Sequence, residues 1–198
     1  MIHLTDAALT GLTIRPETPA DVDAREALLD AAFGPTRHAK TCERLREGRL
    51  PALALAAHRG GRLVGTVRLW SVSAGPGRTA LMLGPLAVDQ GARSEGLGGK
   101  LMRAALNLSA AGGRDAVLLV GDAPYYERFG FSAALTQGLW LPGPVERERF
   151  LGLELVPGAL SGARGLVSPT GERAPTPELG ALVAAAFAHD DALARRAA

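Results

Sequence analysis

The sequence Arg93-Ser94-Glu95-Gly96-Leu97-Gly98-Gly99-Lys100 joins a strand pattern to a helix pattern. Residues 79–88 before it are mostly apolar and predict a strand, while apolar side chains recur every three or four positions from Leu97 to Leu108 and predict a helix. The glycines leave backbone N–H groups uncovered at the start of this helix, where the helix dipole places partial positive charge. We therefore expect the loop to hold an anion such as a diphosphate.

The spacing of these glycines excludes two common phosphate-binding loops. A dinucleotide fingerprint, G-x-G-x-x-G, would need glycine at Leu101, and a P-loop, G-x-x-x-x-G-K-S/T, would need glycine at Ser94. The pattern that fits is R-x-x-G-x-G over residues 93–98. An ordinary tight turn at Gly96 and Gly98 is the alternative to a phosphate loop.

The segments around the loop predict a single mixed α/β sheet. Gly34-Pro35 stops the first helical pattern, and Arg59-Gly60-Gly61-Arg62 has the composition of a hairpin turn. The predicted strands are residues 11–16, 52–58, 63–72, 79–88, 116–120, 131–135 and 150–156, and the predicted helices are residues 19–33, 38–47, 96–111, 124–128 and 178–195.

Two features of the predicted strands bear on the site. Gly84-Pro85 lies inside the strand at residues 79–88, and because proline cannot donate to a ladder we expect a bulge or a splayed edge there. Residues 116–120 form a continuous apolar run, which is typical of a strand covered on both faces. The strand, helix, strand unit over residues 79–120 predicts a parallel pair with a right-handed crossover.

A second motif, YYERFGF at residues 125–131, follows the strand predicted at residues 116–120. With both motifs the chain resembles the GNAT superfamily of acyl-CoA-dependent N-acetyltransferases, whose patterns are Q/R-x-x-G-x-G/A and F-Y-x-x-x-G-F. The stretches LGPLAV, GDAPYYERFGF and FLGLELVPGAL are similar to a bacterial branch of predicted N-acetyltransferases with an undefined acceptor. The resemblance implies an α/β fold with a mixed, mostly antiparallel central sheet flanked by helices, and with splayed fourth and fifth strands.

The resemblance covers residues 12–160, which predicts an acyltransferase domain at residues 1–160. Residues 161–198 begin with a linker rich in Gly, Pro, Ser and Thr and end in the Ala-rich helix predicted at residues 178–195. That helix has Leu179, Leu182 and Phe187 on one side. It packs on the domain, forms a dimer contact or acts as a lid; the sequence leaves these open.

By resemblance, the acyl donor is acetyl-CoA, bound by two segments. Backbone amides of the loop hold the diphosphate of coenzyme A, and unpaired backbone groups of the bulged strand meet the pantetheine and the acetyl oxygen. The alternative is that LGPLAV is only a core strand. The residues implied in cofactor binding are Leu86, Ala87, Val88, Arg93, Ser94, Glu95, Gly96, Leu97, Gly98, Gly99 and Lys100.

Tyr126 is the candidate general acid for the departing thiolate. Its phenol, with an ordinary pKa near 10, is protonated at neutral pH and can donate without prior activation. The alternative is that Tyr126 only packs, as we expect for Tyr125 at the family's apolar position. Phe129 and Phe131 are assigned to the core.

The general base is where the sequence departs from many GNAT enzymes, which carry a glutamate on the fourth strand. Leu81-Met82-Leu83-Gly84-Pro85 offers no carboxylate at this place. Water can take the proton instead, with Asp122 at the end of the fifth strand as the nearest side-chain candidate and His58 as the second. Asp122 otherwise caps the next helix, and His58 is otherwise a solvated strand end.

The resulting prediction is an N-acetyltransferase that moves an acetyl group to a primary amine. A non-catalytic acyl-CoA-binding sensor is the main alternative, and a nucleotide-binding enzyme is disfavoured by the failed glycine patterns. In this superfamily the first two helices select the acceptor, and here residues 33–45 carry mixed charges. Small-molecule, protein N-terminal, lysine and tRNA amines all stay open.

Composition narrows the remaining partners. The 22 basic and 20 acidic residues are interleaved, with a net charge of +2, so no phosphate-tracking stripe is visible and nucleic acid is a disfavoured partner. The single cysteine excludes an internal disulfide, and no metal site is expected. The start of the chain lacks a signal-peptide pattern and no apolar run is long enough to cross a membrane, so we expect a cytoplasmic protein, with a homodimer as a possibility.

Overall fold

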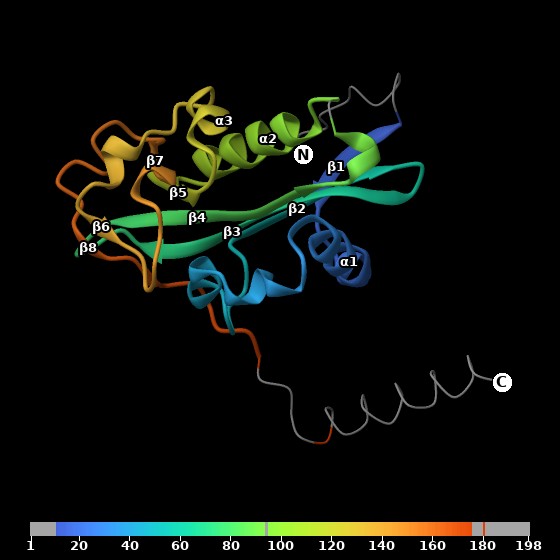
Figure 1. Cartoon of the computed structure of the whole chain (residues 1–198), viewed down its shortest axis with the longest axis horizontal. Helices are drawn as coiled ribbons and strands as arrows, with labels where there is room; N and C mark the ends of the chain where they lie inside the picture. Colours follow the sequence, from blue (N-terminus) through green and yellow to red (C-terminus); the bar gives the residue numbers. More distant parts are fainter. Residues whose placement is uncertain (1–10, 94, 176–179, 181–198) are drawn as a thin grey trace.

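The computed structural model describes residues 11–93, 95–175 and 180. A seven-stranded sheet forms its centre, with the order β1-β2-β3-β4-β5-β7 and with β9 paired to β3 (Figure 1). The strands are β1 (Leu12–Pro16), β2 (Leu53–Arg59), β3 (Arg62–Ser73), β4 (Thr79–Val88), β5 (Ala116–Val120), β6 (Leu139–Trp140), β7 (Phe150–Glu154), β8 (Gly165–Leu166) and β9 (Ser168–Pro169).

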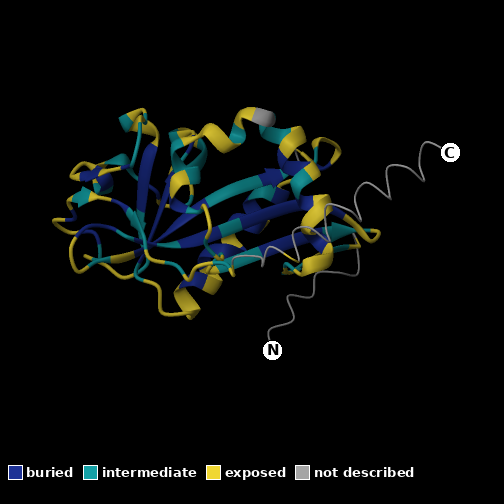
Figure 2. Ribbon diagram, turned by 90° about the horizontal axis from the view of Figure 1, so that it is seen from below, coloured by how far each residue is buried: buried dark blue, intermediate teal, exposed yellow. Residues whose placement is uncertain are grey.

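Helices cover both faces of this sheet. Figure 1 shows α2 (Leu97–Ala111) and α3 (Ala123–Glu127) on one face, and α1 (Val22–Phe33) with the short 3₁₀ helices that follow it on the other. The strands carry most of the buried residues, whereas the outer helix faces are exposed (Figure 2). This three-layer arrangement confirms the predicted α/β fold.

Pairing within the sheet is antiparallel except between β4 and β5. The predicted hairpin joins β2 to β3, with Gly60 at φ +56° and Gly61 at φ +78°. Two successive left-handed residues are what a tight hairpin turn requires, and glycine adopts that conformation at little cost. The mixed, mostly antiparallel sheet is therefore confirmed.

The splayed strands are also confirmed. The parallel pairing of β4 with β5 covers only Leu81 with Val117 and Met82 with Leu118. On the other edge of β4, the register with β3 shifts so that Arg68 alone stands opposite Gly84 and Pro85. Because proline offers no N–H to the ladder, the bulge occurs where the sequence predicts it.

Two predicted elements are wrong. In place of a helix at residues 38–47 there are two 3₁₀ helices, Pro35–Ala39 and Thr41–Leu45, separated by an extended Lys40 at ψ 144°. Leu45 is the one fully buried side chain that the structure describes between Thr36 and Glu47, so no apolar stripe holds a longer helix on the sheet.

The strand expected at residues 131–135 is reduced to a single bridge between Ser132 and Gly152. The Ser132 hydroxyl accepts the N–H of Ala134 at 3.2 Å and begins a 3₁₀ helix, Ala133–Thr136. Serine side chains commonly start helical turns in this way, in competition with strand pairing.

The segment that follows residue 160 contacts the sheet. Although it is mostly loop, as its composition predicts, β9 pairs with the end of β3, β8 pairs with β6, and Val167 between them is fully buried. The helix predicted at residues 178–195 lies outside the described residues, and the division of the chain at residue 160 stays a prediction. No helix in the described part is long and apolar enough to cross a bilayer.

Candidate functional site

The second half of β4 has one edge without a neighbouring strand. The N–H of Asp89 donates to the carbonyl of Val64 on β3 at 2.9 Å. Backbone groups alternate in direction along a strand, so the N–H groups of Leu86 and Val88 point the other way, towards the gap between β4 and β5. The splay thus leaves peptide donors available for a ligand.

A cavity of about 480 Å³ extends along this edge. It connects the end of α1, the unpaired edge of β4, the first turn of α2 and helix α3. Its lining residues are Ala32, Phe33, Leu86, Ala87, Val88, Ala92, Arg93, Gly96, Gly98, Gly99, Tyr125 and Arg128.

Two glycines shape the helix end of the cavity. Gly96 precedes α2 with φ +73°, a left-handed conformation that glycine adopts readily, and its carbonyl accepts the N–H of Lys100 at 3.0 Å. A Cβ atom at Gly98 would lie 2.9 Å from the hydroxyl oxygen of Tyr125. A side chain at this position would therefore displace Tyr125 from the first turn of α2.

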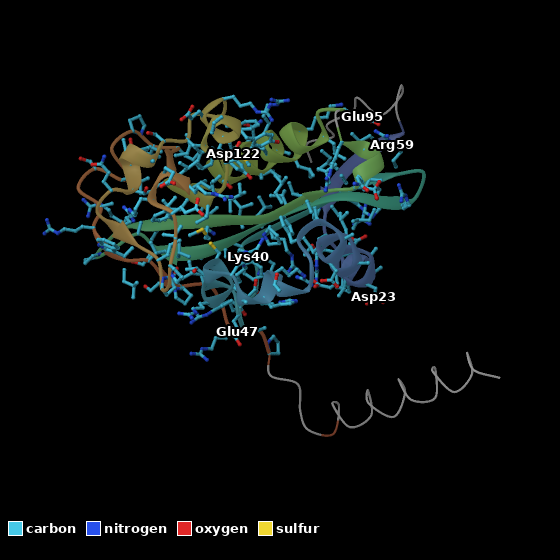
Figure 3. All side chains as sticks on the ribbon, in the orientation of Figure 1. Asp23, Lys40, Glu47, Arg59, Glu95 and Asp122 are labelled. Carbon is cyan, nitrogen blue, oxygen red and sulfur yellow. The ribbon has the colours of Figure 1, made fainter. Side chains whose placement is uncertain are left out.

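The predicted loop residues divide into two groups. Glu95 is paired with Arg59, with 3.0 Å between Oε1 and Nη1, and both side chains lie beside the β2–β3 turn (Figure 3). Leu97 is buried in the apolar core, and Lys100 is exposed. Ser94 lies outside the described residues. The structure brings seven of the predicted cofactor residues to the cavity, namely Leu86, Ala87, Val88, Arg93, Gly96, Gly98 and Gly99.

Tyr126 does not line this cavity but lies close to the strand gap. Its ring covers the backbone of Gly121 directly after β5, so closely that a Cβ atom at Gly121 would clash with it. Continuing the β4–β5 register places Gly121 level with Pro85 across the gap. Burial, with smaller effects from Tyr125 and Asp122, raises the pKa of Tyr126 to about 12.

Asp122 is exposed at the start of α3 (Figure 3). Its backbone carbonyl accepts the N–H groups of Tyr125 and Tyr126 at 3.0 and 3.2 Å, whereas its side chain makes no capping hydrogen bond. The carboxylate of Asp122 is therefore accessible to solvent, although Asp122, like Tyr126, does not line the cavity.

His58 lies elsewhere and is not a solvated strand end. Its Nε2 is 2.9 Å from Oδ1 of Asp21, a carboxylate that also accepts two hydrogen bonds from Arg15. These contacts tie β1, β2 and the start of α1 together, and His58 is absent from the cavity lining. Within the described part of the chain, no cluster of three or more His, Cys, Asp or Glu side chains could hold a metal ion.

Tyr125 and Arg128 are cavity residues that the sequence interpretation missed. Tyr125 was expected to pack, but its hydroxyl faces Gly98 and its ring lies under the Arg128 guanidinium, 3.9 Å from the ring centroid. The spacing of three residues within a helical turn places both on one face, a signal that was available in the motif. The orientation of Tyr125 towards the glycine loop could not be predicted from the motif.

Strand β3 carries a charged residue, Arg68, and a tryptophan, Trp70, next to the bulge of β4. Arg68 donates to both carboxylate oxygens of Glu17, at 3.1 and 2.9 Å, and Glu17 also pairs with Arg25. Burial lowers the pKa of the Arg68 guanidinium. Trp70 Nε1 donates to the carbonyl of Gly84 at 2.8 Å, so a side-chain hydrogen bond from β3 stabilises the bulge.

Comparison with known proteins gives the same picture as the motifs. A family model described as "Acetyltransferase (GNAT) domain" matches residues 13–134. The uncharacterized N-acetyltransferase YhbS of Escherichia coli K12 is 34% identical over 158 residues, which is 79% of this chain and 95% of that protein.

Two solved structures of GNAT proteins also match this chain. The crystal structure of Escherichia coli YhbS in complex with CoA matches 84% of this chain and 93% of its own, with a TM-score of 0.71 and 34% identity. A GNAT family acetyltransferase from Brucella melitensis, in complex with acetyl-CoA, matches the same shares with a TM-score of 0.57 and 26% identity. With its two motifs, its splayed strands and these relatives, the chain belongs to the GNAT family of N-acetyltransferases.

Proposed function

We propose that this chain transfers the acetyl group of acetyl-CoA to a primary amine by direct attack in a ternary complex. The observation that carries the proposal is the cavity of about 480 Å³ that connects the unpaired edge of β4 to the first turn of α2. One elongated ligand with a peptide-like arm and a diphosphate fits both ends of this cavity. The solved relatives that contain CoA and acetyl-CoA share this fold.

The loop supplies the phosphate contacts. Backbone N–H groups around Gly96 and Gly98 and the positive end of α2 bind the diphosphate. Arg93, exposed at the cavity wall, adds a charge-assisted hydrogen bond. Three further loop residues do not line the cavity with their side chains: Glu95, which pairs with Arg59, Leu97, which is buried in the core, and Lys100. They contribute to binding through backbone groups or not at all.

The edge of β4 aligns the acyl group. The N–H groups of Leu86 and Val88 hold the pantetheine arm and, at its end, stabilise the oxyanion that forms when the amine attacks. Ala87 lies between them, and its side chain packs in the cluster that contains Leu28 and Leu29 of α1. Alignment of this kind places the amine and the thioester in reach without a covalent enzyme intermediate.

Tyr126 acts as the general acid. A pKa raised to about 12 keeps the phenol protonated throughout the neutral range. That value lies above the ordinary thiol pKa near 8.5, so complete proton transfer depends on the gap excluding water, which raises the pKa of the departing sulfur as well.

The attacking amine loses its proton to water, and Asp122, exposed at the start of α3, is the side-chain candidate for the base. His58 is held by Asp21 in the contacts between β1, β2 and the start of α1, so we assign it no step. The acceptor is a small-molecule or protein amine rather than nucleic acid, given the interleaved charges, and the protein acts in the cytoplasm. A homodimer stays a prediction.

The test supplies labelled acetyl-CoA and a small-molecule cell extract to the purified protein, with mass spectrometry of the products. We expect a labelled amine, and Tyr126→Phe is expected to lower kcat by about 100-fold while leaving the affinity for acetyl-CoA unchanged. Equal turnover by the variant would remove Tyr126 from the mechanism.

The second candidate function is a non-catalytic acyl-CoA sensor, which the missing carboxylate on β4 favours. It predicts clear thermal stabilisation by acetyl-CoA without a labelled product from small molecules, peptides or whole proteins. Any labelled acceptor that depends on Tyr126 excludes it.

A further inference from the structure

Two arginines from different segments of the chain line the cavity. Arg93 follows β4, and its Nε lies 3.4 Å from the carbonyl oxygen of Val88. Arg128 follows α3 and stacks on the rings of Tyr125 and Phe129, with 3.9 and 4.9 Å from its Cζ to the ring centroids. Arg93 therefore belongs to the glycine loop, whereas Arg128 belongs to the turn that follows α3.

The stack fixes Arg128 without neutralising it. An aromatic ring covers the face of a guanidinium and leaves its N–H donors, which lie in the guanidinium plane, free for an anion. Tyr125 is itself fixed, because its hydroxyl rests against Gly98 and its ring contacts those of Tyr126 and Phe129. Among the described residues, Arg128 forms no ion pair.

The basic wall of the cavity suits a ligand that carries several phosphate groups. Two guanidinium groups line the cavity, and none of its described lining residues is acidic. Coenzyme A carries a third phosphate, a monoester on the 3′ oxygen of the ribose, with close to two negative charges at neutral pH. A planar arginine fork suits such a terminal phosphate.

We infer that Arg128, stacked on Tyr125, binds the 3′-phosphate of coenzyme A and makes the protein select the full cofactor over a form that lacks this phosphate. The inference rests on the proposed use of acetyl-CoA. It adds a specificity residue that lies outside the R-x-x-G-x-G loop.

The experiment compares two ligands, CoA and 3′-dephospho-CoA, by isothermal titration calorimetry on the full chain. Wild-type protein is expected to bind CoA at least tenfold more tightly, which is the size of one charge-assisted interaction. Arg128→Ala is expected to lose this preference by weakening CoA alone. Arg128→Lys, which keeps the charge without the planar fork, is expected to retain part of it.

Arg103→Ala is the matched control, because Arg103 lies 6.0 Å from the Phe129 ring centroid but does not line the cavity. It is expected to keep the full preference for CoA. Thermal unfolding without ligand checks that each variant is folded.

Three results would overturn the inference. Equal loss of both ligands in Arg128→Ala would assign Arg128 to the diphosphate, and unchanged binding would leave it only a stacking role. Equal affinity of wild-type protein for CoA and 3′-dephospho-CoA would also reject the inference while leaving the acetyltransferase proposal intact. A wild-type protein that binds neither ligand would refute the proposal and the inference together.

Discussion

The two halves of β4 have similar apolar sequences but different surroundings. From Ala80 to Leu83 every side chain is buried, and this half pairs with β3 on one edge and β5 on the other. From Gly84 to Val88 the strand pairs with β3 alone, and four of its five residues are only partly buried. The comparison teaches that the neighbouring strand, rather than composition, separates a core segment from one that lines the cavity.

Truncating one residue in each half tests this contrast most strongly. Met82→Ala removes a side chain that is 1% exposed and is expected to lower the free energy of unfolding by about 3 kcal/mol, without changing acetyl-CoA affinity. Leu86→Ala, at the cavity, is expected to cost about 1 kcal/mol of stability and to weaken acetyl-CoA binding severalfold. Urea unfolding and calorimetric titration measure both. The contrast is broken if Met82→Ala weakens binding as much as Leu86→Ala does.

A substitution in the first turn of α2 is expected to do the reverse of Met82→Ala, because it weakens ligand binding more than it changes stability. Gly98→Ala adds a methyl group 2.9 Å from the Tyr125 hydroxyl and is expected to weaken acetyl-CoA binding about tenfold, or about 1.4 kcal/mol. Alanine favours a helix but its methyl group displaces Tyr125, so the two effects oppose each other and the stability of the ligand-free protein is expected to change by less than about 1 kcal/mol. Adding Tyr125→Phe removes the clashing oxygen, so the double variant should regain affinity. No recovery would mean that the methyl group blocks the ligand itself.

The junction of the two halves is tested at Trp70. Trp70→Phe removes the hydrogen bond to the Gly84 carbonyl and is expected to cost about 1 kcal/mol of stability. It should also lower kcat more than it raises KM, because the bulge then holds the acyl group less firmly. Trp140→Phe is the control, since Trp140 is 61% exposed and distant in sequence from the bulge. Identical kinetics for the two variants would dismiss a role for the indole at the site.

The smallest effect on ligand binding is expected away from both halves, at Asp21. Arg15 and Thr18 bind the Asp21 carboxylate and hold its pKa well below the ordinary value near 3.9. A lowered folded-state pKa stabilises the protein above the unfolded-state pKa, and this stability is lost as the pH falls through the folded-state value. The difference in unfolding midpoint between wild type and Asp21→Asn should therefore shrink as the pH falls below about 4. A difference that stays constant or widens below about pH 4 would contradict this assignment.

Local chemistry explains what the sequence could predict. Pro85 cannot donate to a ladder wherever the chain carries it, and glycines at a helix start expose amides in any fold, so the bulge and the loop were predictable. The hairpin at Gly60-Gly61 was predictable for the same reason.

The features that the sequence did not predict depend on contacts between distant segments of the chain. Nothing in the sequence near Glu95 indicates that its partner is Arg59, on a hairpin far along the chain. Similarly, the direction of Tyr125 towards Gly98 depends on where α3 packs, and the broken helix near Lys40 depends on how little of that segment the sheet buries. Tertiary contacts set these features, and local pattern is silent about them.

The bulge at Gly84-Pro85 has one further consequence, for solubility. An unpaired strand edge is a template on which another chain can add a strand, and proteins restrict this risk with short edges and with proline. The open edge of β4 is a few residues long and has Pro85 near its start. The bulge bends β4 where this edge begins, and both the bend and the shortness of the edge restrict the addition of another strand when no ligand lies along it.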